Sequence, residues 1–134
     1  MIHEGGCLCG AVRYRISGEP MGSMVCHCRT CRKVSGAPVI AWLSVARETF
    51  TLEGPTTIFK SSPNVTRTFC AKCGTGLTYE HANEPGEVGV TICSLDDSNA
   101  FPPTHHSWLE HDLNWVKFGD GLPSFQQSRY GNPE

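Results

Sequence analysis

Stretches in which apolar and polar residues alternate occur along the whole chain. In residues 11–16 Val12, Tyr14 and Ile16 fall on one face and the two arginines on the other. Successive side chains of a strand point to opposite faces of the sheet, so this alternation predicts a half-buried β-strand. Residues 39–45 form a continuous apolar run, which is typical of a strand in the middle of a sheet.

Further short strands are expected between the glycines and prolines that interrupt the chain. They cover residues 50–52, 56–60, 65–69, 77–80, 88–92 and 115–118. The hairpin of 65–69 and 77–80 carries a cysteine pair at its tip, and only residues 29–35 suggest one or two helical turns. The pattern therefore predicts a mainly β fold of antiparallel sheets in a single domain, residues 1–134, with the polar residues 128–134 frayed.

The composition is typical of a small β domain. Glycine and proline number 14 and 9 in 134 residues, an excess that favours turns over a helical bundle. Apolar residues make up 39%, so the core is modest and needs covalent or metal support. A net charge of −2 offers no general attraction to nucleic acid. No apolar run approaches the roughly 18 residues of a membrane span.

Cysteine is unusually abundant, with eight residues, seven of them in three tight groups. The groups are Cys7 with Cys9, Cys26 with Cys28 and Cys31, and Cys70 with Cys73. The first residues lack the basic and apolar regions of a secretory signal peptide, so we expect a cytoplasmic protein with reduced thiols. Close spacing strains a disulfide but lets sulfurs converge on one ion, so the pattern predicts bound zinc.

The spacing alone allows two divisions of the seven cysteines, because four thiolates close a structural zinc site and three leave a position open. In the first division, a zinc-ribbon-like site forms from Cys28, Cys31, Cys70 and Cys73, and leaves Cys7, Cys9 and Cys26. In the second, the two pairs join as Cys7, Cys9, Cys70 and Cys73, and the triplet stays together as Cys26, Cys28 and Cys31. The second is physically simpler, because the triplet is local whereas each isolated pair needs a partner.

Several side chains near the triplet are candidates for supporting roles. Arg29, Arg32 and Lys33 follow or interleave with it, and cations there would lower thiol pKa values and attract an anionic substrate. We expect His27 to point away from the flanking sulfurs, as a supporting or surface group. Cys93 is expected to be a small buried apolar residue, the alternative being that it or a histidine closes the second site.

Two later segments also carry polar groups. His105 and His106, beside Trp108, are candidates for lining a pocket. Asp96 and Asp97 are expected to cap a turn in preference to acid–base work.

Six short motifs follow one another along residues 5–125. They are GGCLCG at 5–10, CHCRTCRKVSG at 26–36, FCAKCGTGL at 69–77, SLDD at 94–97, HSW at 106–108 and DGLP at 120–123. In content and order they resemble the glutathione-dependent formaldehyde-activating enzyme family, which also includes centromere-protein-V-like proteins. The resemblance implies an Mss4-like fold, a β-tent of antiparallel sheets stapled by zinc.

The same resemblance implies roles for the cysteines. Cys7, Cys9, Cys70 and Cys73 would hold the structural zinc, and Cys26, Cys28 and Cys31 a second, catalytic zinc. Because three thiolates leave one position open, we expect this second ion to be the more labile. The implied activity is that of a carbon–sulfur lyase acting on glutathione and formaldehyde, or on a related thiol and aldehyde. The alternative is a non-catalytic zinc-binding module for a protein or small thiol. A protein side chain in the fourth position of the triplet would favour that alternative.

Overall fold

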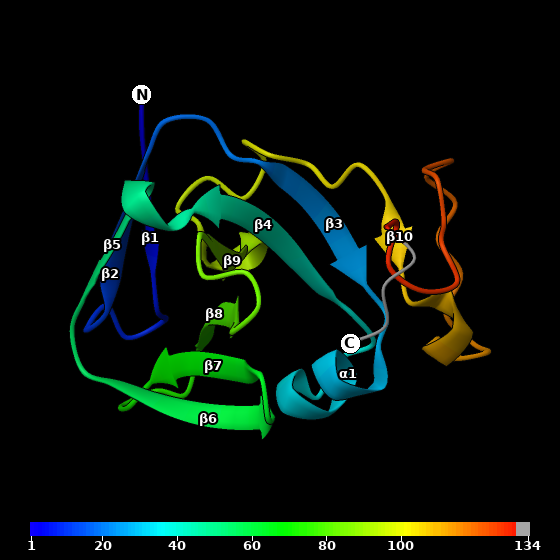
Figure 1. Ribbon diagram of the computed structural model, residues 1–134, viewed down its shortest axis with the longest axis horizontal. Coiled ribbons are helices and arrows are strands. Elements are labelled where there is room, and N and C mark those ends of the chain that lie inside the picture. The colour runs from blue at the N-terminus through cyan, green and yellow to red at the C-terminus, as the bar shows by residue number, and fades with distance from the viewer. Residues whose placement is uncertain (131–134) are drawn as a thin grey trace.

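Two β-sheets make up most of the regular secondary structure in the computed structural model, which describes residues 1–130 (Figure 1). In this part of the chain one sheet has three strands, the other has seven, and nearly all neighbouring strands are antiparallel. The prediction of a mainly β fold built from antiparallel sheets is confirmed. None of the helices in residues 1–130 has the length and apolar character needed to cross a membrane.

The three-stranded sheet contains β1 (Ile2–Gly6), β2 (Arg13–Ser17) and β5 (Phe50–Glu53), with β2 in the middle. Buried and exposed residues alternate along β2, as its sequence predicts, so its apolar face lies in the core. A 3₁₀ turn, η1 (Arg47–Thr49), leads into β5.

The glycines of β1 are required by close packing. A Cβ on Gly5 would lie 2.4 Å from the Tyr14 hydroxyl oxygen, and a Cβ on Gly6 would lie 2.2 Å from the Val12 carbonyl oxygen. Only glycine allows this approach, which fixes the chain against β2 immediately before Cys7.

The seven-stranded sheet carries both of the longer cysteine motifs. Its strands, in spatial order, are β10 (His106–Ser107), β3 (Gly22–Cys26), β4 (Ile40–Ala46), β9 (Glu87–Thr91), β8 (Gly76–His81), β7 (Val65–Cys70) and β6 (Thr56–Ser62). The short β10 pairs in parallel with β3, so a segment near residue 106 lies beside the end of β3. The described residues also form two further 3₁₀ turns, η2 (Ile92–Ser94) and η3 (Leu109–His111).

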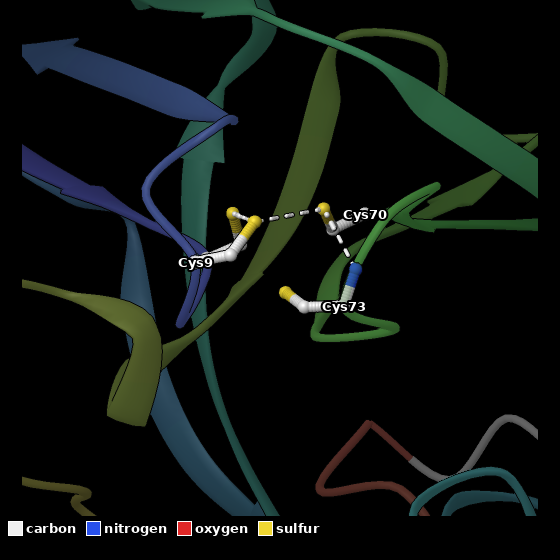
Figure 2. Close-up of side chains that lie close together, drawn as sticks. Cys9, Cys70 and Cys73 are labelled. Carbon is white, nitrogen blue, oxygen red and sulfur yellow. Dashed lines mark hydrogen bonds between the residues drawn. The ribbon is translucent and has the colours of Figure 1, made fainter.

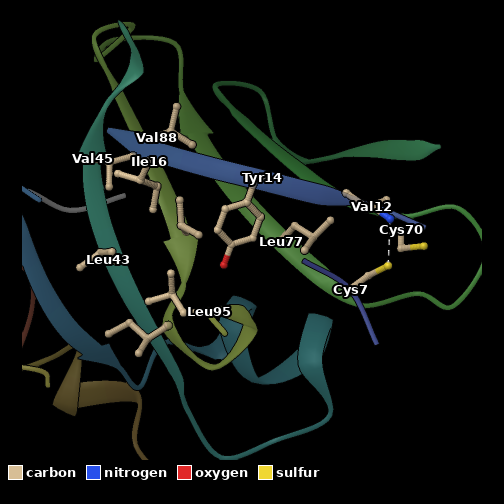
Figure 3. Close-up of a cluster of buried hydrophobic side chains, with 12 residues drawn as sticks. Cys7, Val12, Tyr14, Ile16, Leu43, Val45, Cys70, Leu77, Val88 and Leu95 are labelled. Carbon is tan, nitrogen blue, oxygen red and sulfur yellow. Dashed lines mark hydrogen bonds between the residues drawn. The ribbon is translucent and has the colours of Figure 1, made fainter. Parts of the chain in front are cut away.

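The main hydrophobic core combines buried side chains from both sheets (Figure 3). Tyr14 lies at its centre, 1% exposed, and its hydroxyl group is 2.7 Å from Ser94 Oγ. Burial raises the pKa of this tyrosine to about 12, because the ionised form would be desolvated. The core also includes Cys7 and Cys70, so one cysteine group lies at its edge.

Helix α1 spans Arg29–Ser35, the residues that the sequence predicts. Cys28 caps its start, since its Sγ accepts a hydrogen bond from the Cys31 N–H at 3.3 Å. The helix ends at Gly36, whose φ of 65° is the left-handed conformation that favours glycine. Because α1 follows β3 closely, the cysteines of the triplet come from a strand end, a cap and a first helical turn.

The structure departs from the sequence predictions at several segments. Strands β1, β3 and β10 were not predicted, and residues 115–118 form no strand. In this segment the Val116 N–H bonds back to the Leu113 carbonyl at 3.2 Å, so the backbone is used in a local turn. Trp115 is 68% exposed, which shows that its apolar side chain has no sheet to cover it. Of the predicted frayed tail, residues 131–134 lie outside the described residues.

Candidate metal centres

Two groups of cysteine sulfurs meet in the described residues, and each has the donors to hold a metal ion. The first combines Cys7 and Cys9, after β1, with Cys70 and Cys73 at the β7–β8 turn (Figure 2). The Sγ atoms of Cys7 and Cys9 are 3.5 Å apart, and those of Cys9 and Cys70 are 3.8 Å apart. A tetrahedral zinc site with bonds of about 2.3 Å has edges of about 3.8 Å. The sulfur spacing therefore fits zinc.

Turns around this four-cysteine cluster direct backbone N–H groups at the sulfurs. The Val12 N–H lies 3.2 Å from Cys7 Sγ, and the Lys72 and Cys73 N–H groups lie 3.3 and 3.4 Å from Cys70 Sγ. Hydrogen bonds from the side chain and backbone of Thr75 lower the pKa of Cys73 to about 5. These donors favour thiolates, the form in which cysteine binds a metal.

The second group consists of Cys26, Cys28 and Cys31, all of them buried. The Sγ atoms of Cys26 and Cys31 are 3.5 Å apart. Hydrogen bonding with Cys26 and Cys28, together with the positive charge of Arg67, lowers the pKa of Cys31 to about 3. No fourth histidine, cysteine, aspartate or glutamate of residues 1–130 joins this group. The two clusters correspond to the second of the two divisions that the spacing allows.

The cation beside the three-cysteine cluster is Arg67 on β7, a residue far from the triplet in sequence and not among the candidates above. Its guanidinium nitrogens lie 3.8 and 3.9 Å from Cys31 Sγ. Arg67 is two residues after the buried Val65 and so lies on the same, buried face of β7. This spacing of two residues was the only sign in the sequence that the arginine side chain is buried. The expected cations are elsewhere: Arg29 and Lys33 are exposed, and Arg32 donates to the His111 carbonyl.

A cavity of about 720 Å³ opens onto the three-cysteine cluster. Cys26 and Cys31 lie in its wall beside the aromatic rings of Trp42, Tyr79 and Trp108. The other residues that line the cavity are Met24, Ser44, His81, Asn83, Glu84, Glu87, Gly89, Ser128 and Tyr130. A volume of 300–1,000 Å³ is typical of small-molecule sites, and here the aromatic rings face polar side chains that include Glu84 and Glu87. Trp108 holds its place in the wall with a left-handed backbone, φ 65°, which is rare outside glycine.

A chain of hydrogen bonds runs from His27, which lies between two triplet cysteines in sequence, to the half-exposed Asp120. His27 Nε2 lies 2.8 Å from His106 Nδ1, and His106 Nε2 lies 2.8 Å from Asp120 Oδ2. Burial lowers the pKa of His27, which is only 2% exposed. His27 thus belongs to neither cysteine group and is a buried supporting residue, not a surface one. The parallel pairing of β10 with β3 is what brings His106 beside it.

Other sequence candidates lie away from both clusters. Cys93 is exposed, contrary to expectation, because the η2 turn directs its neighbour Ile92 into the core instead. Asp96 forms an exposed ion pair with Arg13. Asp97 caps a turn by accepting the Asn99 N–H at 3.1 Å.

Both donor sets consist of thiol sulfurs alone, which suit zinc and other soft metal ions. The residues present therefore fit the zinc that the resemblance implies. The four-cysteine cluster matches a closed structural site. The three-cysteine cluster matches a site with one remaining position.

Comparison with known proteins gives three matches. The sequence profile of the family described as "Glutathione-dependent formaldehyde-activating enzyme" matches residues 2–111. A Halomonas elongata protein named "Putative glutathione-dependent formaldehyde-activating enzyme" is 33% identical over 128 residues, which cover 87% of this chain and 81% of that protein. A crystal structure of a Rhodobacter sphaeroides protein has a TM-score of 0.58 at 18% identity, covering 91% of this chain and 98% of the other. This last likeness shows a shared fold.

Proposed function

The chain belongs to the glutathione-dependent formaldehyde-activating enzyme family, and on this basis we propose that it catalyses the addition of a small thiol to an aldehyde. The proposed substrates are glutathione and formaldehyde, or a related pair, and the product is S-(hydroxymethyl)glutathione. In the addition the thiol sulfur bonds to the carbonyl carbon, the C=O π bond opens, and the thiol proton ends on the new hydroxyl oxygen. The reverse reaction breaks the same carbon–sulfur bond, as a lyase does.

The observation that carries this proposal is the position of the three-cysteine cluster in the cavity wall. Cys26 and Cys31 line a cavity of about 720 Å³, which has room for a tripeptide thiol. A purely structural site would be closed by a fourth protein ligand, and residues 1–130 supply none. The alternative of a non-catalytic zinc module is therefore less well supported.

The cavity residues give a physical account of the reaction. Zinc held by Cys26, Cys28 and Cys31 would lower the pKa of the substrate thiol and so stabilise its thiolate form. The rings of Trp42 and Trp108 line the cavity, where they would exclude water and pack against the methylene groups of the thiol substrate. Confinement next to the cysteines holds the thiol and aldehyde together, which raises their effective concentration.

The four-cysteine cluster has a different proposed role. We assign Cys7, Cys9, Cys70 and Cys73 to a structural zinc that joins the small sheet to the β7–β8 hairpin in a single zinc-binding domain, residues 1–134. The described cysteines are all free thiols, and free thiols persist in a reducing compartment. We therefore propose that the protein acts in the cytoplasm.

The test compares Cys28→Ser with Cys93→Ser, since Cys93 is exposed and outside both clusters. Zinc per chain and the rate of S-(hydroxymethyl)glutathione formation are measured on zinc-loaded protein. Cys28→Ser is expected to hold one zinc ion and to lose nearly all acceleration, whereas Cys93→Ser keeps two ions and full rate. Two ions and full turnover in Cys28→Ser, or no acceleration by the unmodified protein with any small thiol and aldehyde, would refute the proposal.

A further inference from the structure

Arg67 is a buried cation that needs a counter-charge. It is 6% exposed, and no carboxylate of residues 1–130 lies within ion-pair distance of it. A buried guanidinium without a negative partner is strongly destabilising. The group beside it that can carry a negative charge is the Cys31 sulfur, 3.8 Å from Nη1 and 3.9 Å from Nη2.

The guanidinium group is fixed in that position from three sides. Its Nε donates to Ser61 Oγ at 3.0 Å. Its central carbon lies 5.2 Å from the ring centre of Tyr79 and 5.9 Å from that of Trp42. Aromatic faces attract a guanidinium group, and its planar shape suits stacking between them. The side chain is therefore held with both terminal nitrogens directed at Cys31.

The two cysteine clusters differ in how their charge is compensated. The four-cysteine cluster is partly exposed at Cys9 and Cys73, so water screens it. Both clusters receive backbone N–H groups, among them those of Lys72 and Cys73 at Cys70 Sγ and that of Cys31 at Cys28 Sγ. The three-cysteine cluster is wholly buried. A divalent ion with three thiolates carries one negative charge, and a fourth thiolate from a substrate would raise this to two. Burying that second charge requires a nearby cation.

We propose that Arg67 is a positioning residue that supplies the counter-charge of the three-cysteine cluster and so permits an anionic thiolate to bind there. This inference rests on the proposed function, because it concerns the same site. It goes further in naming the residue that selects a thiolate over an uncharged ligand. The cations next to the triplet in sequence, Arg29 and Lys33, are exposed and do not supply this charge.

The first test measures zinc retention and needs no thiol substrate. Zinc-loaded wild type, Arg67→Gln, Arg67→Lys and Arg29→Gln are mixed with a chelator, and the release of each zinc ion is followed. Arg29→Gln is the matched control, since it removes one exposed positive charge from α1, the helix that carries Cys31, without removing the charge that faces the Cys31 sulfur. Arg67→Gln is expected to release one of its two ions at least tenfold faster than wild type, and the other at the wild-type rate. The unchanged ion reports that the fold is intact.

The second test measures the equilibrium binding of glutathione and of imidazole, an uncharged ligand for the same position, by calorimetry. Arg67→Gln is expected to bind glutathione at least tenfold more weakly and imidazole as wild type does, with Arg67→Lys between the two. Zinc release from Arg67→Gln at the wild-type rate, or equal weakening for both ligands, would overturn the proposal. If Arg67→Gln fails to fold, Arg67→Met, which is uncharged and fills much of the same buried space, decides by the same criteria. If wild type holds two ions but binds no thiol, the proposed function fails, while zinc release still decides on Arg67.

Discussion

The four-cysteine cluster predicts a large loss of stability when a single sulfur is removed. Cys70 is its most buried member, 1% exposed, and its Sγ receives two backbone N–H groups. We expect Cys70→Ser to lose the zinc ion of this cluster, because serine oxygen is a poor substitute for a thiolate in a soft-donor site. The other cluster, on β3 and α1, supplies none of these four ligands.

The size of the effect follows from the length of chain that the cluster closes. Cys9 and Cys70 are 61 residues apart in sequence. The chain-entropy treatment of a cross-link closing a loop of this length gives about 4 kcal/mol at 25 °C. Structural zinc in small domains contributes on the order of 10 kcal/mol in apparent terms. We therefore expect Cys70→Ser to lose at least about 4 kcal/mol of unfolding free energy. This is a large share of the total, because whole domains have unfolding free energies of about 5–15 kcal/mol.

Urea unfolding of zinc-loaded proteins, followed by tryptophan fluorescence and accompanied by zinc analysis, measures this loss. With a slope of about 2 kcal/mol per molar, the midpoint of Cys70→Ser should fall by about 2 M or more, down to a chain already unfolded without urea. Cys93→Ser, an exposed cysteine outside both clusters, should keep the wild-type midpoint. If Cys70→Ser matched Cys93→Ser in midpoint and zinc content, the assignment of these sulfurs to a metal would be wrong.

Two further predictions concern the core next to this cluster. The pKa of Tyr14 is raised by burial to about 12, so its contribution to stability is complete below pH 10 and is lost as pH rises to 12, about 2.7 kcal/mol in all. At pH 8, Tyr14→Phe should be about 1 kcal/mol less stable than wild type, because it loses the hydrogen bond to Ser94. At pH 12 it should be more stable, because phenylalanine has no group to ionise. If the unfolding free energies of the two proteins did not cross between pH 8 and pH 12, the raised pKa of Tyr14 would be wrong. Gly5→Ala should be destabilised by about 2 kcal/mol or more, because the new methyl group would lie 2.5 Å from the Ser94 carbonyl oxygen, which is backbone and cannot rotate away. Thermal unfolding measures it, with Gly22→Ala, where a Cβ meets nothing within 4 Å, as the control.

Local sequence signals were sufficient for much of the fold. The alternation in β2, the apolar run of β4 and the turn-rich composition gave a mainly β fold, and α1 begins and ends at the predicted residues. Strand β1 was missed because its two glycines are poor strand formers, and they are needed there for close packing. The run at 115–118 looked like a strand because a local pattern cannot show whether a neighbouring strand exists to pair with it.

The site was predictable where its residues are close in sequence. The triplet is local, so its spacing indicated a shared ion, whereas the union of two pairs 61 residues apart depended on the fold. Arg67 was missed because an arginine in a strand is ordinarily directed to solvent. The contact of His27 with His106 could not be inferred either, since it arises from the parallel pairing of β10 with β3.

The backbone and the side chain of Trp108 have opposite effects on stability. Its left-handed backbone costs roughly 1 kcal/mol or more relative to a glycine, yet its indole ring forms part of the cavity wall and packs 5.2 Å from the ring of His111. The residue is only 7% exposed and packs with the buried triplet cysteines. Truncating a buried tryptophan costs about 3–5 kcal/mol, more than the backbone strain would return, so libraries screened for heat resistance or for ligand capture should both keep tryptophan here. Engineering of this scaffold for durability should leave position 108 untouched and seek its gains at the exposed strands far from the cavity.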